Sequence, residues 1–285
     1  MTFLPATRVN YSARLARAEL LSNKLSFATE SLTFYRKIAA FQKHFYEELP
    51  KRGGKRPVVP AGGNFRSELN LTAGLPPFGG FLSVVLSSAP APLAAEASRV
   101  RLLDTSEWSA MLQAFWKMGL VEGEQGNANG RGRSSNPLGE FLCRAYLQPY
   151  AEFIAGAMLP PSPTTTVCRC PRCGSLPLLS VLRQEGDGGK RYLQCALCSQ
   201  EWEFRRIFCA FCGEEDEHKL PVFVSDRFPH IRVESCESCK RYLSSIDLTK
   251  DGNAVPLVDD LSAIPMRLWA EEQGLKRIQS NLLGT

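Results

Sequence analysis

The sequence predicts an α+β protein with a mainly α-helical N-terminal domain, two tandem small β ribbons of the rubredoxin or zinc-ribbon kind, and a C-terminal helix. Three observations predict this class. Apolar residues recur at helical spacing up to about residue 159. Short runs of β-branched, aromatic and aliphatic residues then replace that spacing. Eight of the ten cysteines form four Cys-x-x-Cys pairs between residues 168 and 241.

The helical domain is expected to cover residues 1–159. Its clearest helix carries an aromatic and aliphatic stripe at positions i, i+4, i+7 and i+11, namely Phe34, Ile38, Phe41 and Phe45. Asp104 to Glu107 has the composition of a helix start. A further helix is expected over 137–159, kinked or split at Pro149 because proline lacks the backbone donor. The proline-rich segment 160–167 is expected to be a linker.

The strands are expected to flank the cysteine pairs. The runs that predict them are Leu176–Leu182, Arg191–Gln194, Glu201–Phe208, Leu220–Ser225, Ile231–Glu234 and Tyr242–Leu248. Glycines follow two of the pairs, Gly174 and Gly213, where a left-handed residue lets backbone amides point at sulfur. A closing helix is expected over Asp259–Gly274, despite Pro265, within a C-terminal segment of residues 251–285.

The four cysteine pairs predict two metal sites with four thiolates each, because two Cys-x-x-Cys turns complete a tetrahedron around zinc or iron. The pairs are Cys170/Cys173, Cys195/Cys198, Cys209/Cys212 and Cys236/Cys239. Long gaps follow the first and third pairs and suit hairpins, whereas ten residues separate the second pair from the third. We therefore expect site 1 to combine the first two pairs in a ribbon over 168–208. Site 2 then combines the last two in a ribbon over 209–250, and a cross-braced pairing is the alternative.

Metal sites are favoured over disulfides for these cysteines. Disulfide scaffolds are usually short, secreted and richer in cysteine, and the N-terminal residues show no apolar signal segment. A reducing, cytoplasmic setting is therefore expected. The stretch from the first to the last cysteine of each site is about 30 residues and buries too little surface to fold unaided, which favours a structural role for the metals. Cys143 is expected to be a small buried hydrophobic residue, and Cys168 fits no pattern.

The net charge of +5 is a mild excess of basic residues, for which nucleic acid is one conceivable reason. Two other readings concern the basic residues beside the cysteine pairs: they offset the anionic metal sites, or they are solvated strand residues. These residues are Arg169, Arg172, Lys190, Arg191, Arg205, Arg206, Lys240 and Arg241. The sequence contains no run of 18 apolar residues, so no membrane span is predicted.

The sequence does not predict an enzyme. The three histidines, His44, His218 and His230, have no cysteine or carboxylate neighbours in an arrangement that suggests a nucleophile or general base. Neither a dinucleotide-binding glycine motif nor a nucleophile elbow is present.

Several motifs resemble the formate dehydrogenase accessory proteins, the FdhE family. They are Cys170 to Pro177, Arg191 to Cys198, Glu201-Trp202, Arg205-Arg206, Cys209 to Cys212, Arg144 to Tyr150, Val258 to Leu261 and Gly274 to Gly284. The resemblance covers about residues 140–284. The segment 122–136 and Cys168 match no pattern of that family.

The resemblance implies a cytoplasmic, non-catalytic helper that binds the catalytic subunit of formate dehydrogenase and is needed for active enzyme. It also implies two rubredoxin-like mononuclear sites, with iron as the family's metal and zinc as the common substitute. Two alternatives stay open: a nucleic-acid-binding zinc-ribbon protein, and a rubredoxin-like electron-transfer protein.

Overall fold

The computed structural model describes residues 9–52, 63–69, 71, 77–118, 136–158, 165–185 and 188–283. Residues 159–164, which include most of the expected linker, lie outside this set. In the first half of the chain the described residues form helices, as predicted. They are α1 (Tyr11–Lys24), α2 (Thr29–Glu48), α3 (Phe65–Glu68), α4 (Phe78–Ser88), α5 (Ala91–Arg101), α6 (Thr105–Lys117) and α7 (Pro137–Ala155), with 3-10 turns at Ser26–Ala28 and Leu49–Arg52. Helix α6 starts with a complete capping box between Asp104 and Glu107.

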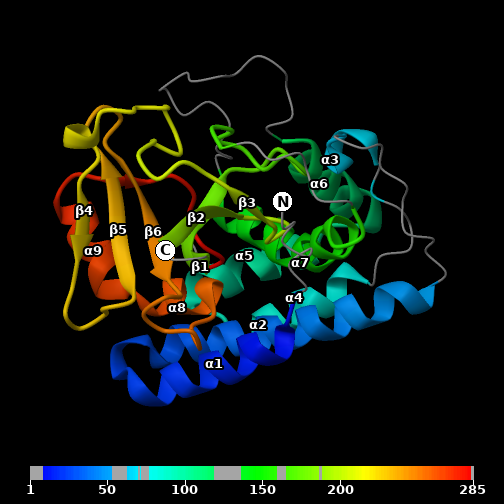
Figure 1. Cartoon of the computed structure of the whole chain (residues 1–285). Coiled ribbons are helices and arrows are strands. Elements are labelled where there is room, and N and C mark those ends of the chain that lie inside the picture. Colours follow the sequence, from blue (N-terminus) through cyan, green and yellow to red (C-terminus); the bar gives the residue numbers. More distant parts are fainter. Residues whose placement is uncertain are drawn as a thin grey trace.

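Helices α1 and α2 run side by side along one edge of the molecule, and α7 packs against α2 (Figure 1). The predicted stripe of α2 is a core face, since Phe34, Ile38 and Phe45 are buried there. Nearly every residue of α7 from Gly139 to Ala155 is buried, so this helix is enclosed on all sides. One continuous core therefore joins the helices to the sheet.

Helix α7 runs through Pro149 without the expected split. Proline has no N–H for the carbonyl four residues earlier, which belongs to Ala145. The side-chain amide of Gln42 in α2 donates a 2.7 Å hydrogen bond to that carbonyl oxygen instead. Gln42 is fully buried, so the carbonyl is satisfied without water. A side chain from a neighbouring helix thus allows the proline inside α7.

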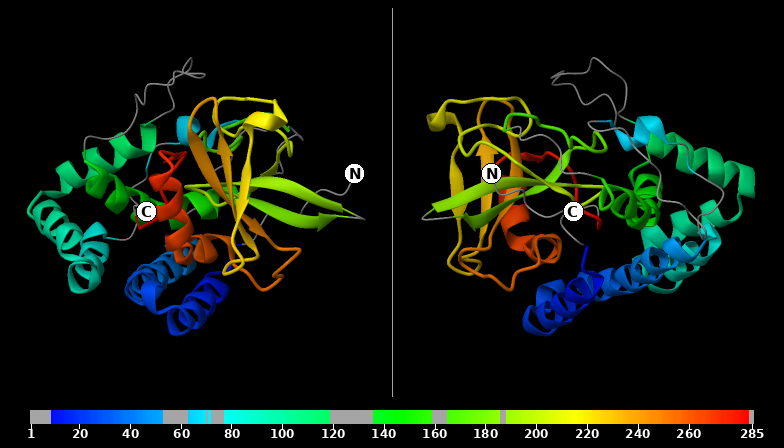
Figure 2. Two further views of the ribbon diagram at one scale, coloured as in Figure 1. Left: turned by 90° about the vertical axis from the view of Figure 1, so that its left-hand side faces the viewer. Right: turned by 45° about the vertical axis from the view of Figure 1, so that its right-hand side comes forward.

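The second half forms one seven-stranded sheet. Its strands are β1 (Pro177–Glu185), β2 (Gly188–Cys195), β3 (Glu201–Glu203), β4 (Val222–Val224), β5 (Ile231–Cys236), β6 (Arg241–Asp247) and β7 (Lys276–Arg277). The order is β3-β2-β1-β6-β5-β4, and β7 pairs with β6. Neighbouring strands within each ribbon are antiparallel, whereas β1 and β6 pair in parallel, with Leu179 opposite Ser244. The two sets of strands are strongly twisted relative to one another (Figure 2).

The parallel β1–β6 pairing joins the two expected ribbons into a single sheet, a relationship that the sequence did not reveal. Two further details differ from expectation. The strand expected over Glu201–Phe208 ends at Glu203. The closing helix is two helices, α8 (Pro256–Ser262) and α9 (Ile264–Glu272), which meet at Ala263. Pro265 explains the break, because it cannot continue the hydrogen bonds of α8.

Candidate metal centres

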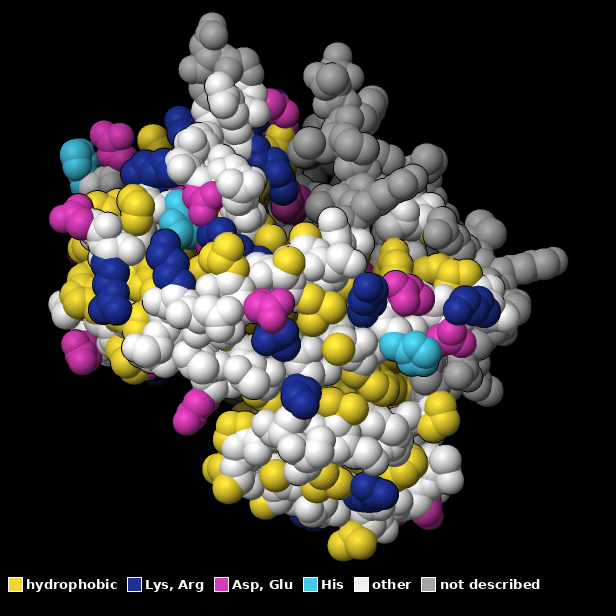
Figure 3. Space-filling model, turned by 90° about the horizontal axis from the view of Figure 1, so that it is seen from below, with side chains coloured by type: hydrophobic (Ala, Val, Ile, Leu, Met, Phe, Trp, Pro, Cys, Tyr) yellow, Lys and Arg dark blue, Asp and Glu magenta, His cyan; other side chains and the backbone are white. Residues whose placement is uncertain are grey.

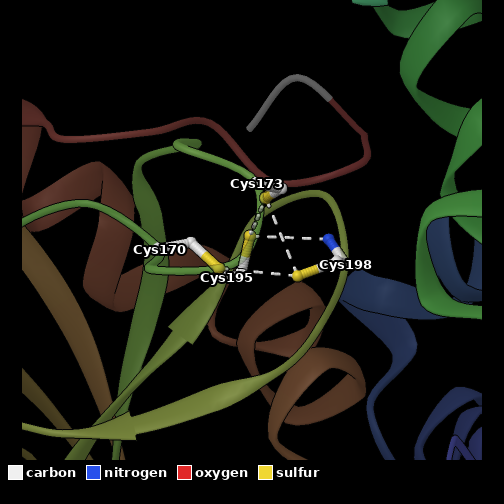
Figure 4. Close-up of side chains that lie close together, drawn as sticks. All are labelled: Cys170, Cys173, Cys195 and Cys198. Atoms are coloured by element: carbon white, nitrogen blue, oxygen red, sulfur yellow. Dashed lines mark hydrogen bonds between the residues drawn. The ribbon is translucent and has the colours of Figure 1, made fainter. Parts of the chain in front are cut away.

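The structure brings Cys170, Cys173, Cys195 and Cys198 together as the first cysteine centre. The first two lie in the turn before β1, and the other two lie at the end of β2 and in the turn after it. Figure 4 shows the four sulfur atoms pointing toward one another. Sγ–Sγ distances are 3.3 Å for Cys173–Cys195, 3.6 Å for Cys170–Cys198 and 3.7 Å for Cys173–Cys198.

The second centre gathers Cys209, Cys212, Cys236 and Cys239 from the loop before β4 and the β5–β6 turn. Its Sγ–Sγ distances are 3.8 Å for Cys209–Cys239 and 3.6 Å for Cys212–Cys236. In each centre consecutive pairs combine, which is the hairpin arrangement and not the cross-braced one. All ten cysteines are free thiols.

Both centres have the size that a tetrahedral metal ion requires. Metal–sulfur bonds of about 2.3 Å give sulfur–sulfur edges of about 3.8 Å. The measured distances of 3.3–3.8 Å fit that tetrahedron after slight expansion. Disulfide sulfurs would lie about 2.0 Å apart. The donor set is therefore suited to zinc or iron, and four thiolates leave no open coordination position for a substrate.

The turns that present the cysteines share one backbone feature. The residue after the second cysteine of each pair has positive φ: Gly174 (69°), Ser199 (54°), Gly213 (79°) and Lys240 (53°). This conformation turns the chain back so that amides reach the sulfur atoms. Leu197 N and Cys198 N each lie 3.4 Å from Cys195 Sγ, and Phe211 N lies 3.4 Å from Cys209 Sγ. Sequence reasoning identified the two glycines but missed Ser199 and Lys240.

The two centres differ in their exposure to solvent. All four cysteines of the first centre are at most 3% exposed. In the second centre Cys212 is exposed and Cys239 is partly exposed. In the metal-free thiols, the hydrogen bond from Cys239 lowers the pKa of Cys209 to about 5, whereas burial raises the pKa of Cys212 to about 11. The second centre is therefore the accessible one.

Two buried arginines lie beside the first centre. Arg66 donates to the carbonyl oxygens of Cys173, Phe115, Trp116 and Met118 and to Ser175, which ties α3 and the end of α6 to the first cysteine turn. Arg172 donates to the carbonyl oxygens of Ala155 and Met158, at the end of α7. Burial lowers the pKa of both guanidinium groups, and the nearby thiolates act in the opposite direction.

These two positive charges offset the negative charge that four thiolates around a divalent ion would carry. Arg172 was among the basic residues that the sequence singled out. Arg66 was missed, because it is more than 100 residues away in sequence from the cysteines it supports. Several of the other basic residues instead pair with strand or loop acids, as in Lys190–Glu185, Arg191–Glu234 and Arg205–Glu215.

A buried acid supports the second turn of the first centre. Glu152 of α7 is fully buried and accepts hydrogen bonds from Ser199, Tyr11 and Arg14, at 2.6, 2.5 and 2.8 Å. Burial would lower the pKa of Arg14, but Glu152 raises it above its ordinary value. Helices α1 and α7 thus clamp the residue that follows Cys198. Sequence reasoning found none of these three helix residues.

The remaining candidate residues lie apart from the centres. His44 and His218 are exposed. His230 and Asp259 are hydrogen-bonded at 2.9 Å, and Arg17 of α1 pairs with both Asp259 and Asp251. Arg17 supplies the positive charge between these carboxylates, so the group is an ion-pair network between α1 and α8.

The two cysteines outside the pairs also differ from each other. Cys143 is buried in α7, as expected for a small hydrophobic residue. Cys168 is half-buried, and its sulfur lies 3.7 Å from the carbonyl oxygen of Cys209. Cys168 therefore neighbours the second centre without belonging to it.

No helix within the described ranges is both long and apolar enough to cross a bilayer. Two family models match the C-terminal part of the chain. The FdhE central domain matches residues 169–206 and the FdhE C-terminal domain matches residues 193–283. The central-domain match contains the four cysteines of the first centre. The C-terminal match contains the four cysteines of the second centre together with Cys195 and Cys198.

Curated relatives and a solved structure agree with these models. Two of the relatives are named "Protein FdhE homolog". The one from Aquifex aeolicus is 37% identical over 116 residues, which cover 40% of this chain and 41% of that protein. The one from Pseudomonas aeruginosa is 39% identical over 119 residues, which cover 40% of this chain and 38% of that protein. The matches thus span about two-fifths of the relatives' length. The crystal structure of the FdhE protein from Pseudomonas aeruginosa superposes with a TM-score of 0.70 at 22% identity over 98% of both chains, which shows the fold.

Proposed function

Because this chain belongs to the FdhE family through its residues 169–283, we propose that it is an accessory protein for formate dehydrogenase. It binds the catalytic subunit in the cytoplasm, is needed for formation of the active enzyme, and catalyses no reaction itself. Each cysteine centre holds one iron or zinc ion. Cys170, Cys173, Cys195 and Cys198 are the ligands of the first ion, and Cys209, Cys212, Cys236 and Cys239 are the ligands of the second.

The observation that carries this proposal is the closed geometry of the first centre. Four thiolates surrounded by protein leave no position at which a substrate could bind the metal. The ion there would serve to hold the turns before β1 and after β2 against α7, since the turns are anchored to α7 through Arg172 and Ser199. A rigid sheet fixed to a helical body is the kind of scaffold that a docking protein needs.

The test is deletion of the gene followed by complementation. We expect deletion to abolish formate oxidation and wild-type protein to restore it. The Cys170→Ser/Cys173→Ser variant should fail to restore it, whereas Cys143→Ser, which changes a buried cysteine outside both centres, should succeed. Unchanged formate oxidation after deletion would contradict the proposal.

One observation favours a second candidate, rubredoxin-like electron transfer. The second centre lies at the surface, with Cys212 exposed, and electron transfer requires a metal close to solvent. This candidate predicts a reversible iron couple in protein isolated from its native host, and a colourless zinc protein would exclude it. Nucleic-acid binding has less support, because on the face seen in Figure 3 basic side chains are interspersed with acidic ones.

A further inference from the structure

A cavity of about 200 Å³ lies beside the second cysteine centre, and Cys209 and Cys236 form part of its wall. Basic residues dominate its polar lining. Four arginines converge on it from β2, β5, β6 and the segment after β3: Arg191, Arg232, Arg241 and Arg206. The acidic residue among its described lining residues is Glu234, which accepts a hydrogen bond from Arg191. The rest of the wall includes apolar side chains such as Leu182 and Val222.

Two of these arginines have an acidic partner, Arg191 with Glu234 and Arg232 with Asp247, but each also keeps a donor that is unused. The Nε atoms of Arg191 and Arg232 are buried and have no hydrogen-bond partner among the described residues. The side chain of Arg191 is only 6% exposed. Arg206 is exposed and pairs with no acid in the ranges that the structure describes. Buried donors are normally satisfied, so this arrangement points to an acceptor that the chain does not supply.

The cysteine centre does not account for these donors. The sulfur of Cys209 accepts a hydrogen bond from a backbone amide of its own turn, and the other described sulfurs that accept from nitrogen do the same. In the described part of the chain, none of the four guanidinium groups of the cavity bonds to a sulfur. An oxyanion is the class of acceptor that suits such donors. Planar guanidinium groups recognise a carboxylate or a phosphate with two parallel hydrogen bonds.

The edge of the sheet adjoins this cavity. Strand β4 has a neighbour on one side, β5, and is the last strand in that direction. Val222 and Val224 are 51% and 65% exposed, and Val222 also lines the cavity. The alternate residue, Phe223, packs on Trp269 of α9 with ring centroids 4.7 Å apart, which covers the other face of the strand. An uncharged, apolar edge of this kind is a template for strand addition.

We propose that this cavity and the edge of β4 form one docking surface for the catalytic subunit. An extended acidic segment of that subunit adds to β4 and places a carboxylate among the arginines. Charge complementarity selects this occupant over a second copy of the chain, whose own cavity is basic. The inference rests on the proposed function, because it names the surface that the client contacts.

The test measures binding of the purified catalytic subunit to the full-length metal-loaded protein. Arg206→Glu reverses an exposed charge that pairs with no acid in the described ranges, and Val224→Glu places an acid on the free edge. The matched control is Arg101→Glu on α5, far from the cavity in the helical half. We expect both test variants to weaken binding by about tenfold or more at low salt. The control should bind within about twofold of wild type, and all variants should keep wild-type metal content.

The outcomes separate this surface from its alternatives. Equal binding by wild type and both test variants would overturn the docking surface and leave the proposed function intact. No binding by wild type would remove the proposed function and this inference with it. A wild-type dimer that Val224→Glu dissociates would make a second copy the occupant. Tight binding of acetate or phosphate, with subunit binding unaffected by Arg206→Glu, would make the cavity a small-anion site.

Discussion

The hydroxyl of Ser199 donates a 2.6 Å hydrogen bond to Oε1 of Glu152, across 47 residues of sequence. Ser199 has the left-handed backbone conformation in the turn that follows Cys198, and Glu152 is fully buried in α7. The helical half of the protein therefore contacts the first centre through a specific polar link. Stability of that centre and packing of α1 on α7 should depend on each other.

Replacing Glu152 with alanine should destabilise both the first centre and the packing of α1 on α7. The change leaves the buried guanidinium of Arg14 without its acid, which typically costs about 3–5 kcal/mol. We expect a lower thermal midpoint and faster loss of metal to a chelator. Glu140→Ala, on the first turn of the same helix, is the control and should behave like wild type. Wild-type stability in the Glu152 variant would show that the link is unimportant.

The hydrogen bond from Gln42 to the Ala145 carbonyl should matter only because Pro149 is present. Gln42→Leu leaves that buried carbonyl unsatisfied and should cost about 1–3 kcal/mol. Pro149→Ala restores a backbone donor, so the double variant should lose less stability than the sum of the two single changes. Denaturant unfolding of the four proteins measures this coupling. Strict additivity would mean that the glutamine does not compensate for the proline.

Metal should leave the two centres at different rates. The second centre has an exposed cysteine, whereas the cysteines of the first are almost completely enclosed. A chelator should therefore remove one equivalent quickly and the other slowly. In Cys212→Ser the fast phase should be lost, and in Cys173→Ser the slow phase. Two equivalents leaving in a single phase would contradict the difference in exposure.

Arg66 should be hard to replace. It donates to four carbonyl oxygens and a hydroxyl from a buried position, a pattern that matches the several donors of a guanidinium group. Arg66→Lys keeps the charge but loses most of these bonds, so we expect a loss of about 2–4 kcal/mol. The exposed Arg101→Lys is the matched control and should cost less than about 0.5 kcal/mol. Calorimetric midpoints compare the two, and equal midpoints would refute the role assigned to Arg66.

Local signals predicted much of this structure, whereas long-range relationships were out of reach. The helical spacing of Phe34, Ile38 and Phe45 marks a core face because that periodicity is a property of one segment. The parallel pairing of β1 with β6 joins strands about 65 residues apart and has no local signature. Arg66 and Glu152 support the first centre from distant helices, so no spacing rule could find them.

The breaks in regular structure show the same division. Pro265 separates α8 from α9, as the rule for proline predicts. Pro149 does not interrupt α7, because a side chain from α2 takes over the missing donor's role. The sequence contains both prolines but not the tertiary contact that distinguishes them.

The most direct measurement is the metal content and thiol state of protein purified from its native host. We expect two equivalents of iron or zinc per chain, falling to one in Cys173→Ser and to one in Cys212→Ser. A folded protein without metal, or one with its paired cysteines oxidised to disulfides, would show that the two centres are not metal sites.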